Sequence, residues 1–128
     1  MNEQVKKLLQ EHVWTLATMG ETPNVVPIGT TCINAQGQLL LGDVMMETSA
    51  ANVRATGKVA VCAWDPKTAE GYQLKGSAVY ETEGPNFEQF NKAVTTQTRG
   101  SMELKGVIVL TPEETIVLTP GPNNKQRL

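Results

Sequence analysis

Few residues in this chain of 128 have the type and spacing that catalytic chemistry requires. His12 is the single histidine, so any nucleophile triad would depend on it, yet no serine or cysteine signal stands beside it. We expect it to lie at the end of a helix. Cys32 and Cys62 each lie in an apolar run, and their separation fits neither a metal site nor a redox CxxC motif. We expect both to be buried thiols, and no metal centre.

The strongest candidate for a binding site is the pair Thr48 and Ser49, which opens a segment that we expect to be helical from 47 to 55. At a helix start, free backbone N–H groups, hydroxyls and the positive end of the helix dipole converge, and this combination binds anions. The same hydroxyls could instead simply cap the helix, and the local sequence alone favours that interpretation. The two interpretations predict different functions.

The familiar nucleotide-binding motifs are absent from the sequence. Gly71 and Gly76 have the spacing of the first two glycines of a phosphate-binding loop, but Ser77 stands where that loop requires lysine. The chain has no GxGxxG motif. Adjacent glutamates such as Glu113 and Glu114 lie in a predicted turn, where solvated carboxylates are the ordinary case. We therefore expect no catalytic side chain.

The elements around these residues are short and mostly extended. Apolar spacing predicts a helix over 2–11, strands over 13–19 and 25–33 that form a hairpin, a strand over 38–42, the helix over 47–55, strands over 59–64 and 72–82, a helix after Gly84-Pro85, and one bent strand or a strand pair over 104–118. Loops of hairpin length favour antiparallel pairing. The sequence therefore predicts a mainly β fold with six or seven strands, closed into a small barrel or a curled sheet.

Composition sets the broad class of the protein. A chain with 40% hydrophobic and 19% charged residues and a net charge of −2 is expected to form one soluble domain, and it lacks the basic footprint of a nucleic-acid-binding protein. No apolar stretch approaches a membrane span and no signal peptide is evident, so we expect a cytoplasmic protein. We place the domain at 1–119 and a polar tail, which frays or docks on a partner, at 120–128.

The order of several weak motifs resembles a known family. These motifs are 23–29 (PNVVPIG), 48–54 (TSAANVR), 58–61 (KVAV), 74–78 (LKGSA) and 82–88 (TEGPNFE). Over about residues 5–118 the chain resembles the FMN-binding split-barrel family related to pyridoxamine 5′-phosphate oxidase, and most of all its small stand-alone FMN-binding proteins. The resemblance implies a six-stranded antiparallel split β-barrel and a homodimer, with one FMN at each end of the subunit interface.

The resemblance also implies where the cofactor would lie. Val26, Pro27 and Ile28 would run along the isoalloxazine ring, and Val44 and Met45 would flank the ring or the ribityl chain. Thr48 and Ser49 would hold the phosphate. Ile116 of the partner subunit would approach the other side of the ring.

One departure from the family pattern bears on this site. Relatives commonly place a lysine where Thr48 stands, so the phosphate would lack a direct cationic partner unless Arg54 or Lys58 reaches it, and we expect weaker retention of FMN. The additional basic residues and longer C-terminal region of the relatives that oxidise pyridoxamine phosphate have no counterpart here. Oxidation of vitamin B6 is therefore not expected.

Three functions remain open at the level of sequence. The first is a homodimeric flavoprotein that acts in electron transfer or as a small FMN-dependent oxidoreductase, with an unidentified redox partner. The second is a non-catalytic module that stores FMN or holds another cofactor, such as a deazaflavin or haem. The third is a structural domain in which Thr48 and Ser49 only cap a helix.

Overall fold

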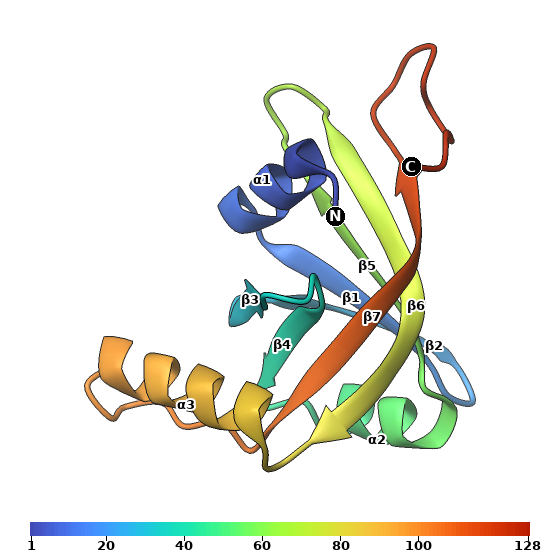
Figure 1. Ribbon diagram of the computed structural model, residues 1–128. Helices are drawn as coiled ribbons and strands as arrows, with labels where there is room; N and C mark the ends of the chain where they lie inside the picture. Colours follow the sequence, from blue (N-terminus) through green and yellow to red (C-terminus); the bar gives the residue numbers. More distant parts are fainter.

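A single curled antiparallel sheet forms the body of the protein, and three short helices pack around it (Figure 1). The computed structural model describes all 128 residues. The strands are β1 (Trp14–Met19), β2 (Pro23–Ile28), β3 (Thr31–Ile33), β4 (Leu39–Asp43), β5 (Lys58–Trp64), β6 (Gly71–Glu81) and β7 (Gly106–Val117), and the helices are α1 (Glu3–Glu11), α2 (Glu47–Thr56) and α3 (Pro85–Gln97). The strand order β2-β1-β5-β6-β7-β4-β3 confirms the prediction of an antiparallel split barrel, with seven strands where the resemblance implied six.

The two longest strands, β6 and β7, form the curved centre of the sheet. Their register shifts between Lys75 and Gly76, and a β-carbon at Gly76 would lie 2.0 Å from the carbonyl oxygen of Thr111. Only glycine fits this close approach, which lets the strands bend around the core. For residues 104–118 the sequence predicts either one bent strand or a strand pair, and the structure has a single strand, β7.

Two apolar clusters hold the helices to the sheet. The larger one fills the barrel with side chains such as Trp14, Leu16 and Leu74, and α1 closes it with Val5, Leu8 and Leu9. Strict alternation of buried and exposed residues in β5 is typical of a strand with one face on this core. The smaller cluster lies under α3, which contributes Phe90 and Val94.

The prediction of one strand over 25–33 is wrong, and the break matters for the site. Strand β2 ends at Ile28 and β3 starts at Thr31, and the two lie at opposite edges of the sheet. The chain crosses from one edge to the other through Gly29 and Thr30, and the Thr30 carbonyl accepts a hydrogen bond from the Gly42 N–H at 2.8 Å. This crossing is the seam where the barrel stays open.

The C-terminal segment 120–128 turns back onto its own chain, as the loop at the C-terminus in Figure 1 shows. The Val117 N–H donates to the Gln126 carbonyl at 2.8 Å, and the Leu128 N–H donates to the Thr115 carbonyl at 2.9 Å. Arg127 adds an ion pair with Glu114 at 2.9 Å. The tail thus pairs with the end of β7, beyond the part of that strand that β4 covers.

The cysteines differ from their prediction as well. Both are free thiols and both are half-buried, not buried. Cys62 falls at an outward position of β5, and Cys32 lies in the edge strand β3, where desolvation raises the pKa of its thiol. No helix of the structure has the length and apolar character needed to span a membrane.

Candidate functional site

A cleft of about 930 Å³ opens at the seam of the barrel, between β2, the end of β4 and the start of α2. Its lining residues are Asn24, Val26, Pro27, Ile28, Gly29, Thr30, Gly42, Val44, Met45, Met46, Glu47, Thr48, Ser49, Met102 and Lys105. The cleft thus brings together seven of the eight residues predicted to bind a cofactor. Ile116 is not among them, because it lies near the end of β7, beyond the part of that strand that pairs with β4 beside the cleft. Its contact with a partner's cofactor stays a prediction.

The cleft combines apolar side chains with the unpaired edge of a strand. Ile28 and Met46 are each 8% exposed and belong to the barrel core, whereas Met45 is 86% exposed at the rim. Strand β2 pairs only with β1, so the hydrogen-bonding groups on its other edge have no strand partner. An edge strand also tolerates Pro23 and Pro27, which cannot donate to a ladder. The cleft therefore offers an apolar surface next to backbone groups that have no hydrogen-bond partner in the sheet.

The start of α2 is held by a residue outside the helix. Met46 is the N-cap residue, and its N–H donates to Asp43 Oδ1 at 2.7 Å. Thr48 and Ser49 lie within the first turn and neither side chain caps the helix, so the interpretation of these hydroxyls as caps is wrong. The N–H groups of Glu47, Thr48 and Ser49 have no protein acceptor. They remain available to a ligand in the cleft.

Ser49 is fixed from the other side of the cleft. The Asn24 Nδ2 group donates to Ser49 Oγ at 3.1 Å and to Thr18 Oγ1 at 3.3 Å, and Asn52 Nδ2 also donates to Thr18 at 3.0 Å. Ser49 is only 3% exposed, while Thr48 is exposed and makes no side-chain hydrogen bond. Asn24 was not among the predicted site residues, although an amide within the PNVVPIG strand is a visible signal.

Asp43 links the start of α2 to the sheet. It is 4% exposed, and its second oxygen accepts a short hydrogen bond from the Tyr80 hydroxyl. Burial and the bond to Asp43 raise the pKa of Tyr80 to about 12. The Arg54 guanidinium lies 4.1 Å from the centre of the Tyr80 ring, a cation–π distance. Arg54 is therefore engaged outside the cleft.

The charged lining differs from the expectation. Neither Arg54 nor Lys58, the two cations expected to reach a bound phosphate, is among the residues that line the cleft. The cleft's charged side chains are Lys105 and Glu47. Lys105 could not be predicted as a site residue, because it is far from Thr48 along the chain and comes close only when β7 pairs with β4.

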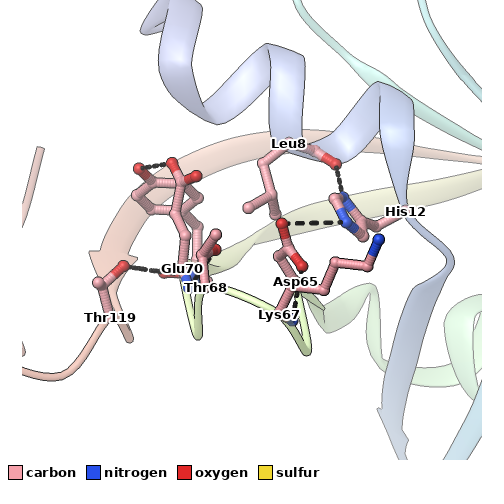
Figure 2. A network of polar contacts seen from close by, with 9 residues as sticks. Leu8, His12, Asp65, Lys67, Thr68, Glu70 and Thr119 are labelled. Carbon is pink, nitrogen blue, oxygen red and sulfur yellow. Dashed lines mark hydrogen bonds and ion pairs between the residues drawn. The ribbon is translucent and has the colours of Figure 1, made fainter.

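His12 lies at another site and has a structural role. Its Nδ1–H donates to the Leu8 carbonyl at 3.0 Å, and Nε2 lies 3.7 Å from Asp65 Oδ2 (Figure 2). The Lys67 N–H that donates to Asp65 is the main cause of the lowered pKa of that carboxyl group. The neighbourhood of His12 thus completes the end of α1, as expected. No cluster of three or more potential metal-ligating side chains occurs in the structure.

Comparisons with known proteins agree on the fold. HupZ of Group A Streptococcus superposes with a TM-score of 0.84 at 22% identity, covering 96% of this chain and 98% of that one. An FMN-binding protein of Syntrophomonas wolfei superposes with a TM-score of 0.79 at 17% identity, covering 94% and 87%. A putative pyridoxamine 5′-phosphate oxidase of Lactobacillus delbrueckii gives 0.72 at 20% identity, covering 91% and 93%.

The curated proteins contain no significant match to this sequence. The sequence model of the pyridoxamine 5′-phosphate oxidase family, by contrast, matches residues 1–119, which is nearly the whole chain and includes every residue of the cleft. The split-barrel fold and this match lead to the same assignment, and the chain belongs to the pyridoxamine 5′-phosphate oxidase family.

Proposed function

We propose that the protein is an FMN-binding flavoprotein that holds the flavin in the cleft at the barrel seam. The observation that carries the proposal is the convergence, in one cleft, of an apolar wall, the free edge of β2 and the open first turn of α2. The volume of about 930 Å³ is in the range of small-molecule sites. Bound FMN would supply the redox chemistry, and the protein would orient and tune it.

The start of α2 suits the phosphate end of FMN. Three N–H groups without acceptors, from Glu47, Thr48 and Ser49, meet the Thr48 hydroxyl at the positive end of a helix. Such a helix start stabilises a phosphate by direct donation and by its dipole. The Asp43 bond to Met46 fixes this turn before any ligand arrives, which lowers the entropy lost on binding.

The remainder of the cleft suits the flavin ring. An isoalloxazine is flat and apolar in its middle and carries donors and acceptors along one edge. Val26, Ile28 and Val44 offer apolar contact, and the unpaired backbone of β2 offers partners for the polar edge. These features support the proposed placement of the ring between β2 and Val44.

We also propose that the active form is a homodimer with the cleft at its interface. On the outward face of the sheet, Val25 of β2, Ala17 of β1 and Ala60 of β5 lie side by side in the strand register. Val25 is 65% exposed. Trp64 is 54% exposed on the same side of β5. A face of this kind is typical of a subunit interface. Pro27 lies on this face and also lines the cleft, so a second copy seated there would cover one side of the ring.

Purification tests the flavin proposal directly. We expect a yellow protein, or a colourless one that turns yellow with added FMN, and release of FMN on denaturation. Protein that stays colourless in excess FMN would contradict the proposal. In sedimentation experiments we expect a dimer, and Ala60→Arg should give a monomer with weakened FMN binding, whereas Thr96→Arg on the exposed side of α3 should change neither. A monomeric wild-type protein with full affinity would refute the interface.

Within this proposal the protein is either an oxidoreductase or a non-catalytic flavin carrier. The residues that line the cleft support the carrier function. Lys105 and Glu47 are the only ionisable side chains among them, and the two do not form a pair that could act as a general acid and a general base. Rapid reduction of the bound flavin by a nicotinamide, well above the rate for free FMN, would establish the oxidoreductase. A bound flavin that reacts no faster than free FMN would leave the carrier function.

A further inference from the structure

The two charged side chains that line the cleft, Lys105 and Glu47, have opposite signs, and neither forms an ion pair. We propose that Lys105 is the cation that binds the phosphate of FMN, in place of the lysine missing at position 48, and that Glu47 limits this affinity. The inference rests on the proposed FMN site and assigns its preference for a phosphorylated flavin.

Asp43 places Lys105 and the start of α2 next to each other. The Lys105 N–H donates to the Asp43 carbonyl at 2.8 Å, while the Asp43 side chain accepts from the Met46 N–H at 2.7 Å. The preceding residue, Leu104, is 4% exposed and its N–H donates to Asn91 Oδ1 at 2.9 Å. The backbone of Lys105 is therefore fixed, and its exposed side chain is free to turn into the cleft.

The balance of charge in the cleft favours this assignment. A phosphate at the start of α2 would lie beside the Glu47 carboxylate, which repels it. The helix dipole and three N–H groups offset part of that repulsion, and a lysine ammonium can offset the remainder as a flexible point charge. Lys105 is the cation of the cleft, since Arg54 stacks on Tyr80 and Lys58 lies elsewhere.

The test compares FMN with riboflavin, which has the same ring and ribityl chain but no phosphate. Dissociation constants are measured by quenching of flavin fluorescence for the wild type, Lys105→Gln, Lys105→Arg and Glu47→Gln. Lys105→Gln should weaken FMN about tenfold and riboflavin less than about twofold. Lys105→Arg should retain most of the affinity, and Glu47→Gln should tighten FMN by about threefold without affecting riboflavin.

Lys92→Gln, an exposed lysine of α3 outside the cleft, controls for net charge and should change neither constant. Equal changes for FMN and riboflavin in Lys105→Gln, or no change in either, would overturn the role of Lys105 and leave the FMN proposal intact. A wild-type protein that binds neither flavin would overturn the proposed function itself, and this inference with it.

Discussion

Helices α1 and α2 begin in opposite ways. At α1, Asn2 Oδ1 accepts from the N–H groups of Gln4 at 2.8 Å and Val5 at 3.4 Å, so one side chain satisfies the first turn. At α2, no side chain caps the helix and three N–H groups of the first turn have no protein acceptor. The first arrangement serves stability alone, whereas the second leaves donors exposed to the cleft.

An uncapped helix start must be stabilised by other contacts. In α2 these are the Asp43 bond to Met46, the burial of Ala50 and Val53 against the core, and a left-handed Gly57 whose N–H donates to the Val53 carbonyl at 2.9 Å. The first turn of a helix can therefore keep N–H groups without acceptors when the strand before the helix and the turn after it fix its position. The contrast with α1 also indicates which substitutions will separate stability from binding.

The largest effect is expected from Asp43→Ala. The change strands two buried donors, the Met46 N–H and the Tyr80 hydroxyl, so we expect the free energy of unfolding to fall by about 3 kcal/mol. Urea unfolding of the FMN-free protein measures it. Asp43→Asn keeps an acceptor and should lose about half as much. If Asp43→Ala were as stable as the wild type, α2 would not depend on this anchor.

The double substitution Thr48→Ala with Ser49→Ala is expected to weaken FMN by about tenfold. It should cost only about 1 kcal/mol of stability, because Thr48 makes no side-chain hydrogen bond and Asn24 keeps its bond to Thr18. Titration with FMN and with riboflavin checks the first effect, and urea unfolding the second. Thr96→Ala on α3 is the matched control. Unchanged FMN affinity would show that the phosphate lies elsewhere.

For the self-capped helix the expectation is reversed. Asn2→Ala should lower the free energy of unfolding by about 1 kcal/mol, because it removes the acceptor for two N–H groups, and should leave FMN affinity unchanged. Asn2→Asp keeps the acceptor and should be close to the wild type. A change in FMN affinity with Asn2→Ala would mean that the two helix starts are coupled through the barrel. It would contradict the separation between a stabilising start at α1 and a binding start at α2.

The contrast between the helices also shows what the sequence could predict. Apolar spacing placed both helices within a residue or two, since α1 spans Glu3–Glu11 and α2 spans Glu47–Thr56 with Gly57 behind it. The cap of α1 is local in sequence, because the Asn2 side chain bonds to the N–H groups of its own chain neighbours. The interpretation of Thr48 and Ser49 as caps of α2 is wrong because the residue that anchors this helix, Asp43, belongs to the preceding strand. Local sequence also does not distinguish a hydroxyl inside the first turn from one at the N-cap.

Only the Thr48–Ser49 part of the site could be predicted from local sequence, as the start of a helix. Residues 26–28 and 44–45 were implied by the family resemblance alone, and they meet the start of α2 only where the curled sheet brings β2 next to the end of β4. Lys105 and the break at Gly29 were not predictable, since both depend on which strands close the barrel. The alternating pattern of β5 indicates that Cys62 points away from the core. An apolar run, however, does not indicate which face of the strand a partner covers.

Alkaline pH also tests the comparison, because one tyrosine of β6 lies near each helix start. Tyr80 donates to Asp43 near α2, and Tyr72 donates to Glu70 at 2.7 Å beside Asn2 and Gln4 of α1. Burial is the main cause that raises the pKa of each to about 12, against 10 in the unfolded chain. Between pH 10 and 12 the unfolded state binds fewer protons, so the free energy of unfolding falls as pH rises.

Urea midpoints of the FMN-free protein at pH 9 and pH 11 measure this loss. Tyr80→Phe should remove the part that arises at α2, and Tyr72→Phe the part that arises at α1, because phenylalanine does not titrate. Since a charged Tyr80 would face the Asp43 carboxylate that anchors α2, its deprotonation should also weaken FMN binding, whereas that of Tyr72 should not. The alkaline loss of affinity should therefore be smaller in Tyr80→Phe than in the wild type, and an equal loss in the two proteins would contradict the role of Asp43 in holding the open turn.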